Sequence, residues 1–331
     1  MMEFLELSVM HKPVWMWAAF ISVVLLLLAF DLGILHRKDS EISVKQSLKL
    51  SAFYICMGLL FGVFVWAELG AQSAQEYYTG FLIEKTLSMD NIFVISLVFS
   101  YFAIPRKYQY RVLFWGIIGV IILRALLIGI GATLVQEFHW VLYIFAAFLI
   151  FTGIKMLKGS DEEHDISKNP IIRFFKKYMR CTDDFHGNKF FVRKIDANTN
   201  KRALFATPLF LALITVEFVD LIFAVDSVPA IFAITTDEYI VYTSNIFAIL
   251  GLRALYFALA AMLHRFAYLK YSLSAVLIFI GGKVFAPLVF DIEKVPASIS
   301  LSVTVAILAA GVIYSLHKTK KSEKSRESRV E

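Results

Sequence analysis

Cysteine is scarce in this sequence, and neither of the two cysteines is placed for chemistry. Cys56 lies inside an apolar run, Cys181 lies in a charged segment, and no CxxC motif is present. A disulfide framework is therefore not expected. The sequence also gives no support for thiol redox chemistry.

Charge, proline and glycine are also low. Only 18% of the 331 residues are charged, whereas 59% are hydrophobic. Ordinary soluble domains have about 25% charged and about 45–50% apolar residues, so the chain is built for lipid rather than for water. The seven prolines and sixteen glycines are too few for a disordered or fibrous chain.

Long apolar runs fill most of the chain. A membrane span needs about 20 predominantly apolar residues, and nine stretches satisfy or nearly satisfy this length. We expect an all-α polytopic membrane protein with about nine transmembrane helices. It forms a single transmembrane domain over residues 1–317, followed by a basic cytoplasmic tail at 318–331. The spans are Val14 to Leu35, Leu48 to Ala67, Gly80 to Ile104, Leu113 to Val135, Trp140 to Leu157, Leu204 to Ile234, Asn245 to His264, Ser272 to Phe290 and Ala297 to Leu316.

The loop charges predict the orientation. Most lysines and arginines fall in the loops after spans one, three, five and seven and in the tail, whereas the other loops have only Lys12 and Lys294 beside acidic residues. The positive-inside rule therefore predicts an outside N-terminus and a cytoplasmic C-terminus. The long loop at 158–203 is then cytoplasmic. It is interpreted as a solvated connector, with a metal-sensing or partner-docking element as the alternative.

The sequence also predicts an internal repeat. Residues 123–126 and 252–255 both read Leu-Arg-Ala-Leu, and 149–155 resemble 277–283. Acids six residues apart occur in spans three and six. The repeat units, about 80–157 and 204–290, each contain three spans, so the two copies must be inverted in the membrane. Inverted repeats are the architecture of many secondary transporters, with the substrate site near the midplane.

Acidic residues lie within the predicted spans. An ionisable group near the bilayer centre costs a few kcal/mol or more, so it is a functional-site hypothesis by default. Basic residues in the spans are the available partners, and the bland alternative is that these charges only pair helices. The acids are Asp31, Glu84, Asp90, Glu217, Asp220 and Asp226, and the charge-compensating bases are Arg124, Arg253, Lys85 and Lys283.

The donors near these acids suit a hard metal ion. Ser88 and Asn91 add oxygens to span three, and Pro229 frees a carbonyl and favours local unwinding beside Asp226. Oxygen ligands suit Mn²⁺, Mg²⁺ or Ca²⁺, whereas Zn²⁺ and copper favour histidine or cysteine. The predicted metal ligands are thus the six acids with Ser88 and Asn91. Crowded carboxylates in a low dielectric also bind protons readily, which makes proton exchange available.

The motifs at residues 84–93 and 217–230 resemble the paired signatures of the TerC family, closest to its Alx-like members. The first reads Glu84-Lys85-x-Leu87-Ser88-x-Asp90-Asn91-x-Phe93, and the second contains Glu217, Asp220 and Asp226-Ser227-x-Pro229-Ala230. The resemblance covers Asp31 to about Leu316. It implies a multi-pass inner-membrane protein of the LysE-type exporter superfamily, associated with manganese efflux, named for tellurite resistance and sometimes labelled a redox modulator.

The expected function is export of a divalent metal ion, most suitably Mn²⁺, without enzymatic activity and without a permanently bound cofactor. The expected partners are the metal ion and the lipid bilayer, with no nucleic acid. One alternative is an amino-acid or small-solute exporter in which Arg124 and Arg253 bind a carboxylate. Another is a tellurite-resistance or redox-associated membrane protein without transport of its own.

Overall fold

The structure is a computed structural model of the whole chain, and it describes residues 8–33, 43–157, 179–182, 184–195, 201–259, 269–290 and 295–327. Within these ranges the side chains of 31–33, Asp90, Asp226 and 320–327 lie outside the description.

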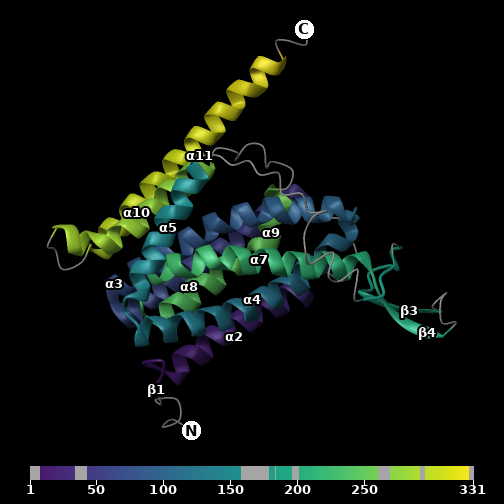
Figure 1. Cartoon of the computed structure of the whole chain (residues 1–331), viewed down its shortest axis with the longest axis horizontal. Helices are drawn as coiled ribbons and strands as arrows, with labels where there is room; N and C mark the ends of the chain where they lie inside the picture. Colours follow the sequence, from purple (N-terminus) through teal and green to yellow (C-terminus); the bar gives the residue numbers. More distant parts are fainter. Residues whose placement is uncertain are drawn as a thin grey trace.

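Helices make up nearly all of the described fold, and they gather into one bundle (Figure 1). Two short antiparallel pairs, β1 with β2 and β3 with β4, are the exceptions to the all-α prediction, and the second projects from one end of the bundle. The elements are β1 Ser8–Val9, β2 Lys12–Pro13, α2 Val14–Gly33, α3 Val44–Tyr101, α4 Arg106–Glu137, α5 Val141–Leu157, β3 Phe191–Ile195, β4 Arg202–Ala206, α7 Pro208–Phe232, α8 Glu238–Leu250, α9 Leu252–Leu259, α10 Leu269–Phe290 and α11 Ala297–Glu327.

Six helical segments among the described residues are long and apolar enough to cross a membrane. They are α3, α4, α7, α8 with α9, α10 and the part of α11 up to Thr319; Val14–Phe30 and α5 are shorter apolar helices. The chain is therefore a mostly helical membrane protein, whereas the count of nine spans stays a prediction. Helix α11 runs on to Glu327, so the predicted tail begins inside a helix.

Helix α3 contains two predicted spans and reverses between them. The Tyr77 hydroxyl donates to the Gly58 carbonyl at 2.9 Å, across 19 residues. Those residues would be about 28 Å apart in a straight helix, so the two arms must lie side by side. The turn is at Gly70, where φ is 86° and ψ is 178°. Glycine adopts a positive φ without the steric penalty of other residues, which explains the reversal there.

The expected unwinding at Pro229 is not observed. Helix α7 runs from Pro208 to Phe232 with this proline inside it. A proline removes one backbone donor and favours a kink, but packing of the surrounding side chains can keep the helix continuous. Val228 and Ala230, on either side of the proline, are buried in the largest apolar cluster, which explains why the helix continues.

The helices pack in pairs: α3 with α8, α4 with α7, and α5 with α10. The α5–α10 contact is reciprocal. A Cβ at Gly153 would lie 2.9 Å from the Ser274 carbonyl oxygen, and a Cβ at Gly281 would lie 2.6 Å from the Ala146 carbonyl oxygen. Each glycine thus allows the backbone of the other helix to approach closely, as small residues do between membrane helices.

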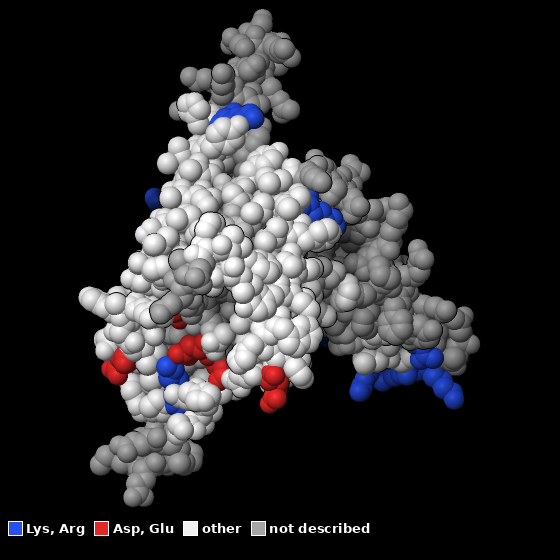
Figure 2. Space-filling view, turned by 60° about the vertical axis from the view of Figure 1, so that its left-hand side comes forward, with Lys and Arg blue, Asp and Glu red and all other residues white. Residues whose placement is uncertain are grey.

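The visible acidic side chains are confined to one end of the molecule (Figure 2). In that view they gather in the lower part with some basic side chains among them, whereas further basic side chains lie at the top and on the right. Arg193, Lys194 and Arg202 belong to the β3–β4 hairpin. This separation follows the loop charges on which the predicted orientation depends.

Candidate functional site

Arg124 is the centre of a buried polar network. Only 1% of its surface is exposed. Its guanidinium donates to both oxygens of Asp220, from Nη2 at 3.1 Å and from Nε at 3.2 Å. The third nitrogen, Nη1, forms an ion pair with Glu84. Arginine suits this role because its planar guanidinium presents several donors in a fixed geometry.

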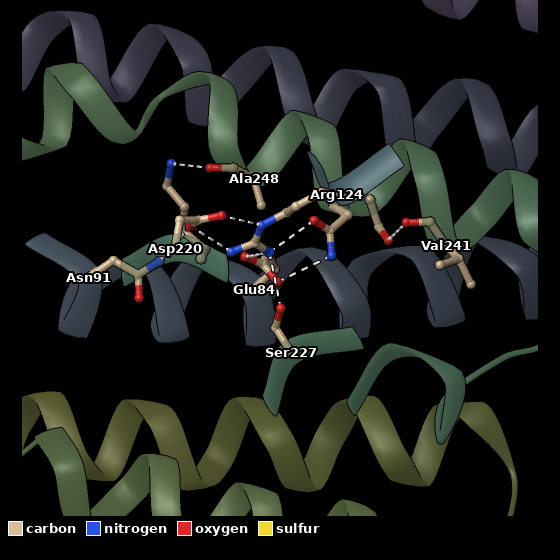
Figure 3. A network of polar contacts seen from close by, with 10 residues as sticks. Glu84, Asn91, Arg124, Asp220, Ser227, Val241 and Ala248 are labelled. Carbon is tan, nitrogen blue, oxygen red and sulfur yellow. Dashed lines mark hydrogen bonds and ion pairs between the residues drawn. The ribbon is translucent and has the colours of Figure 1, made fainter. Parts of the chain in front are cut away.

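Two carboxylates therefore share one guanidinium. Glu84 comes from the second arm of α3, Arg124 from α4 and Asp220 from α7, and all three are buried (Figure 3). The two acids are the predicted counterparts of each other in the two repeats. Counted by formal charge, these three residues carry one net negative charge in a setting with little water to screen it.

Neutral side chains complete the network. Arg124 Nη1 donates to Ser227 Oγ and to Asn245 Oδ1, both at 3.1 Å. Asn245 Nδ2 donates to Glu84 Oε2 at 3.2 Å, and Asn91 Nδ2 donates to Asp220 Oδ1 at 3.1 Å. The predicted donor Asn91 thus joins the network. Ser227 and Asn245 were not predicted to belong to it.

Several buried oxygens around the network accept no hydrogen bond from the described residues. They are Ser88 Oγ, Asn91 Oδ1 and both carboxylate oxygens of Glu217. Buried polar atoms almost always have partners, so these oxygens are available to a water or to a bound ligand. These oxygens are the donors that the sequence predicted for a hard cation.

Glu217 occupies a notch in α4. A Cβ at Gly119 would lie 2.2 Å from Glu217 Oε1, whereas one at Gly116 would be 3.8 Å away. Glycine at 119 is therefore required for the observed position of this carboxylate. The described hydrogen bonds of the Arg124 network do not include Glu217.

A small cavity adjoins the network. Its volume is about 20 Å³, and Asn91, Asp220 and Arg253 are among its lining residues. A cavity of about 10–15 Å³ on this measure holds one water, so the space suits a single water-sized occupant.

The other predicted charge-compensating residues have different contacts. Lys85 Nζ donates to the Ala248 carbonyl at 2.9 Å. The Arg253 guanidinium lies over the Tyr110 ring at 4.3 Å and the Phe114 ring at 5.7 Å. Lys283 Nζ donates to Ser300 Oγ at 3.2 Å, on the wall of a larger cavity. Among the described side chains, Arg124 forms ion pairs with two of the predicted acids, Glu84 and Asp220.

Three predicted ligands, Asp31, Asp90 and Asp226, have side chains outside the described residues. Among the side chains that are described, no three His, Cys, Asp or Glu residues form a group that could hold a metal. The complete predicted ligand set therefore stays a prediction.

The bundle and its buried ionic network define a polytopic helical membrane protein with an intramembrane polar site. Residues 69–323 match the family of integral membrane proteins called TerC, and the chain belongs to this family.

The chain is similar to full-length relatives from several bacteria. An "Uncharacterized membrane protein" of Rickettsia bellii is 50% identical over 300 residues, which is 91% of this chain and 96% of the relative. A protein of Escherichia coli K12 named "Putative membrane-bound redox modulator Alx" is 42% identical over 320 residues, covering 94% and 97% of the two chains. No solved structure matches the chain.

Proposed function

We propose that this protein exports a divalent metal ion, with Mn²⁺ the best-suited substrate, across a bacterial inner membrane. One observation carries the proposal: two buried carboxylates share one arginine while neighbouring oxygens accept no described hydrogen bond. An excess of acceptors over donors, together with net negative charge, is the arrangement that a cation satisfies.

Arg124 acts as the resident counter-ion of this site. Two carboxylates without a cation are costly to bury, so the guanidinium holds them together between transport events. An arriving divalent cation competes with Arg124 for the oxygens of Glu84 and Asp220. This competition keeps binding reversible, as transport requires.

The substrate is assigned from the donor chemistry. Glu84, Asp220, Glu217, Ser88 and Asn91 offer carboxylate, hydroxyl and amide oxygens, which suit Mn²⁺, Mg²⁺ and Ca²⁺.

Two further acids, Asp90 and Asp226, directly precede Asn91 and Ser227 in sequence. Consecutive Cα atoms are about 3.8 Å apart, so their backbones lie at the network and both acids remain in the proposed ligand set.

The proposed cycle exchanges the metal for protons. Carboxylates of the ligand set that lose their cation and are not paired with Arg124 favour the neutral, protonated form in a low dielectric, so protons return to them as the metal leaves. Efflux driven this way is faster when the outside is more acidic than the cytoplasm.

The proposed architecture has nine spans in a LysE-type arrangement, with an inverted repeat, the N-terminus outside and the C-terminus inside. The helix pairs support the repeat. A twofold axis between the repeats would exchange α3 with α7 and α4 with α8. It would therefore map the α3–α8 contact onto the α7–α4 contact, and both contacts are present. It also maps Gly153 onto Gly281, whose contacts are reciprocal. A self-complementary contact is the signature of a twofold relation.

The test is cellular manganese content in a bacterial strain that lacks its own exporters. Wild-type protein is expected to lower the manganese content, whereas Asp90→Asn and Asp226→Asn are expected to abolish the effect at equal membrane expression. Glu137→Gln is the matched control, because Glu137 is an exposed acid at the end of α4. Unchanged manganese with wild-type protein contradicts the proposal.

The names of the Alx relatives favour a second candidate, redox modulation at the membrane. Neither Cys56 nor Cys181 forms a disulfide in the described structure, and Cys56 is exposed. If the second candidate is correct, the double variant Cys56→Ser/Cys181→Ser loses its cellular phenotype and Asp226→Asn keeps it. Metal export predicts the opposite pattern.

A further inference from the structure

A cavity separate from the small one at the network lies where α3, α10 and α11 pack together. Its volume is about 410 Å³, which is within the range of about 300–1,000 Å³ of small-ligand sites. Its walls combine apolar side chains with polar groups: one carboxylate, two carboxamides, hydroxyls and one ammonium. The residues used below are Gln72, Gln75, Glu76 and Thr79 from α3, Lys283 from α10 and Ser300 from α11.

The cavity contains a buried acid. Glu76 is 8% exposed, and its Oε1 accepts a hydrogen bond from Gln72 Nε2 at 3.1 Å. The ammonium of Lys283 lies on another part of the wall and donates to Ser300 Oγ at 3.2 Å. The cavity thus offers oxygen acceptors to a cation, together with one fixed positive charge that weakens its binding.

The cavity and the Arg124 network are on the same helical arm. Glu76 precedes Glu84 by eight residues of the second arm of α3. At about 1.5 Å per residue, the two carboxylates are about 12 Å apart along the helix axis. This part of α3 follows the turn at Gly70, which the loop charges place at the outer side of the membrane.

We propose that this cavity is the outer vestibule of the transport path, a second and weaker site for the hydrated divalent cation. The inference rests on the proposed function. Glu76 supplies the charge, and the amide and hydroxyl oxygens contact the water shell of the ion. Such water-mediated contacts bind nearly as well as direct ones.

Lys283 lowers the affinity of the vestibule for the cation. A path conducts only when each site binds strongly enough to be entered and weakly enough to be left. A fixed ammonium beside the site raises the free energy of the bound cation by Coulomb repulsion. The exporter therefore releases its ion at the outer face instead of retaining it.

The test is Mn²⁺ binding to the purified full-length protein, followed by the electron paramagnetic resonance signal of free Mn²⁺. Wild-type protein is expected to show one tight class of site, assigned to the network, and one weak class. Glu76→Gln is expected to lose the weak class and keep the tight class. Lys283→Gln is expected to tighten the weak class about fivefold, which corresponds to about 1 kcal/mol.

The opposite signs of the two variants separate the inference from a folding defect, because a misfolded protein does not gain affinity. The vestibule proposal is contradicted if the tight class of site and transport are present but neither substitution changes Mn²⁺ binding to the weak class. It is also overturned if Lys283→Gln weakens binding of a zwitterionic probe, glycine, in place of tightening Mn²⁺ binding. Loss of the tight class and of transport in wild-type protein contradicts the proposed function itself.

Discussion

Arg124 and Arg253 occupy matching positions in the two Leu-Arg-Ala-Leu motifs, yet their surroundings differ. Arg124 binds two carboxylates, whereas the guanidinium of Arg253 lies over the faces of Tyr110 and Phe114. Both residues are at most 4% exposed. Burial alone therefore does not decide what an intramembrane arginine does.

Within the described side chains, the two predicted repeats contribute differently to the Arg124 network. Glu84 and Asp220 are counterparts in the predicted repeats, and both bind the arginine of the first repeat. Arg253 remains close, because it lines the same small cavity as Asp220. In the inverted-repeat exporter that we propose, this arrangement would belong to one of the two alternating states.

The largest expected effect is that of Arg124→Met, which leaves two buried carboxylates without their counter-ion. Breaking a buried ion pair costs about 3–5 kcal/mol, so we expect a large loss of thermal stability in detergent. Arg253→Met is the matched variant. Its cation–π contacts are worth about 0.5–2 kcal/mol, so a smaller loss is expected. Equal losses for the two variants contradict the assigned difference.

A rescue experiment sharpens this result. Adding Glu84→Gln and Asp220→Asn to Arg124→Met removes the unpaired charges and is expected to restore much of the stability, without transport. Failure to restore it indicates that Arg124 stabilises the bundle by packing instead of by charge.

Asn245→Ala is expected to have an intermediate effect. The change removes a donor to Glu84 and an acceptor for Arg124, each within a buried network. A buried group left without its partner costs about 1–3 kcal/mol. Thr243→Ala is the control on the same helix, since its hydroxyl bonds only to carbonyls of its own helix among the described residues. If Thr243→Ala loses more stability than Asn245→Ala, the result contradicts the role of Asn245 in the network.

A small effect on stability is expected from Gly119→Ala, which moves Glu217 out of its notch. The new Cβ would lie 2.2 Å from the carboxylate, so the side chain must shift. Overpacking of this kind costs about 1–3 kcal/mol, less where a flexible side chain can move. Gly116→Ala, at 3.8 Å, is expected to change little. If only Gly119→Ala reduces transport, the result supports a role for Glu217 in the transport path. If transport is equal in the two variants, the result contradicts that role.

The sequence predicted the membrane class, and it singled out residues that the structure brings together, for a physical reason. Charged groups are costly in lipid, so Glu84, Arg124 and Asp220 stand out against their apolar neighbours. Asn91 was found because it follows an acid within the same motif. Composition and hydropathy require no knowledge of packing, and the family match agrees with them.

Details set by tertiary packing could not be predicted. Asn245 was placed at a span boundary, but α8 begins at Glu238 and carries it into the bundle. Pro229 stays within a continuous helix, although local propensity favours a break. Which arginine binds the acids, and that Lys283 lies on a cavity wall, depend on how the helices meet. Sequence periodicity does not contain that information.

The central claim is that the buried acids bind a divalent cation in transit. The most direct measurement is Mn²⁺ flux through the purified protein in proteoliposomes under an imposed proton gradient. We predict flux with wild-type protein, and none with Asp220→Asn at unchanged fold and orientation. Flux that is the same in the two proteins, or absent from wild-type protein, contradicts the account.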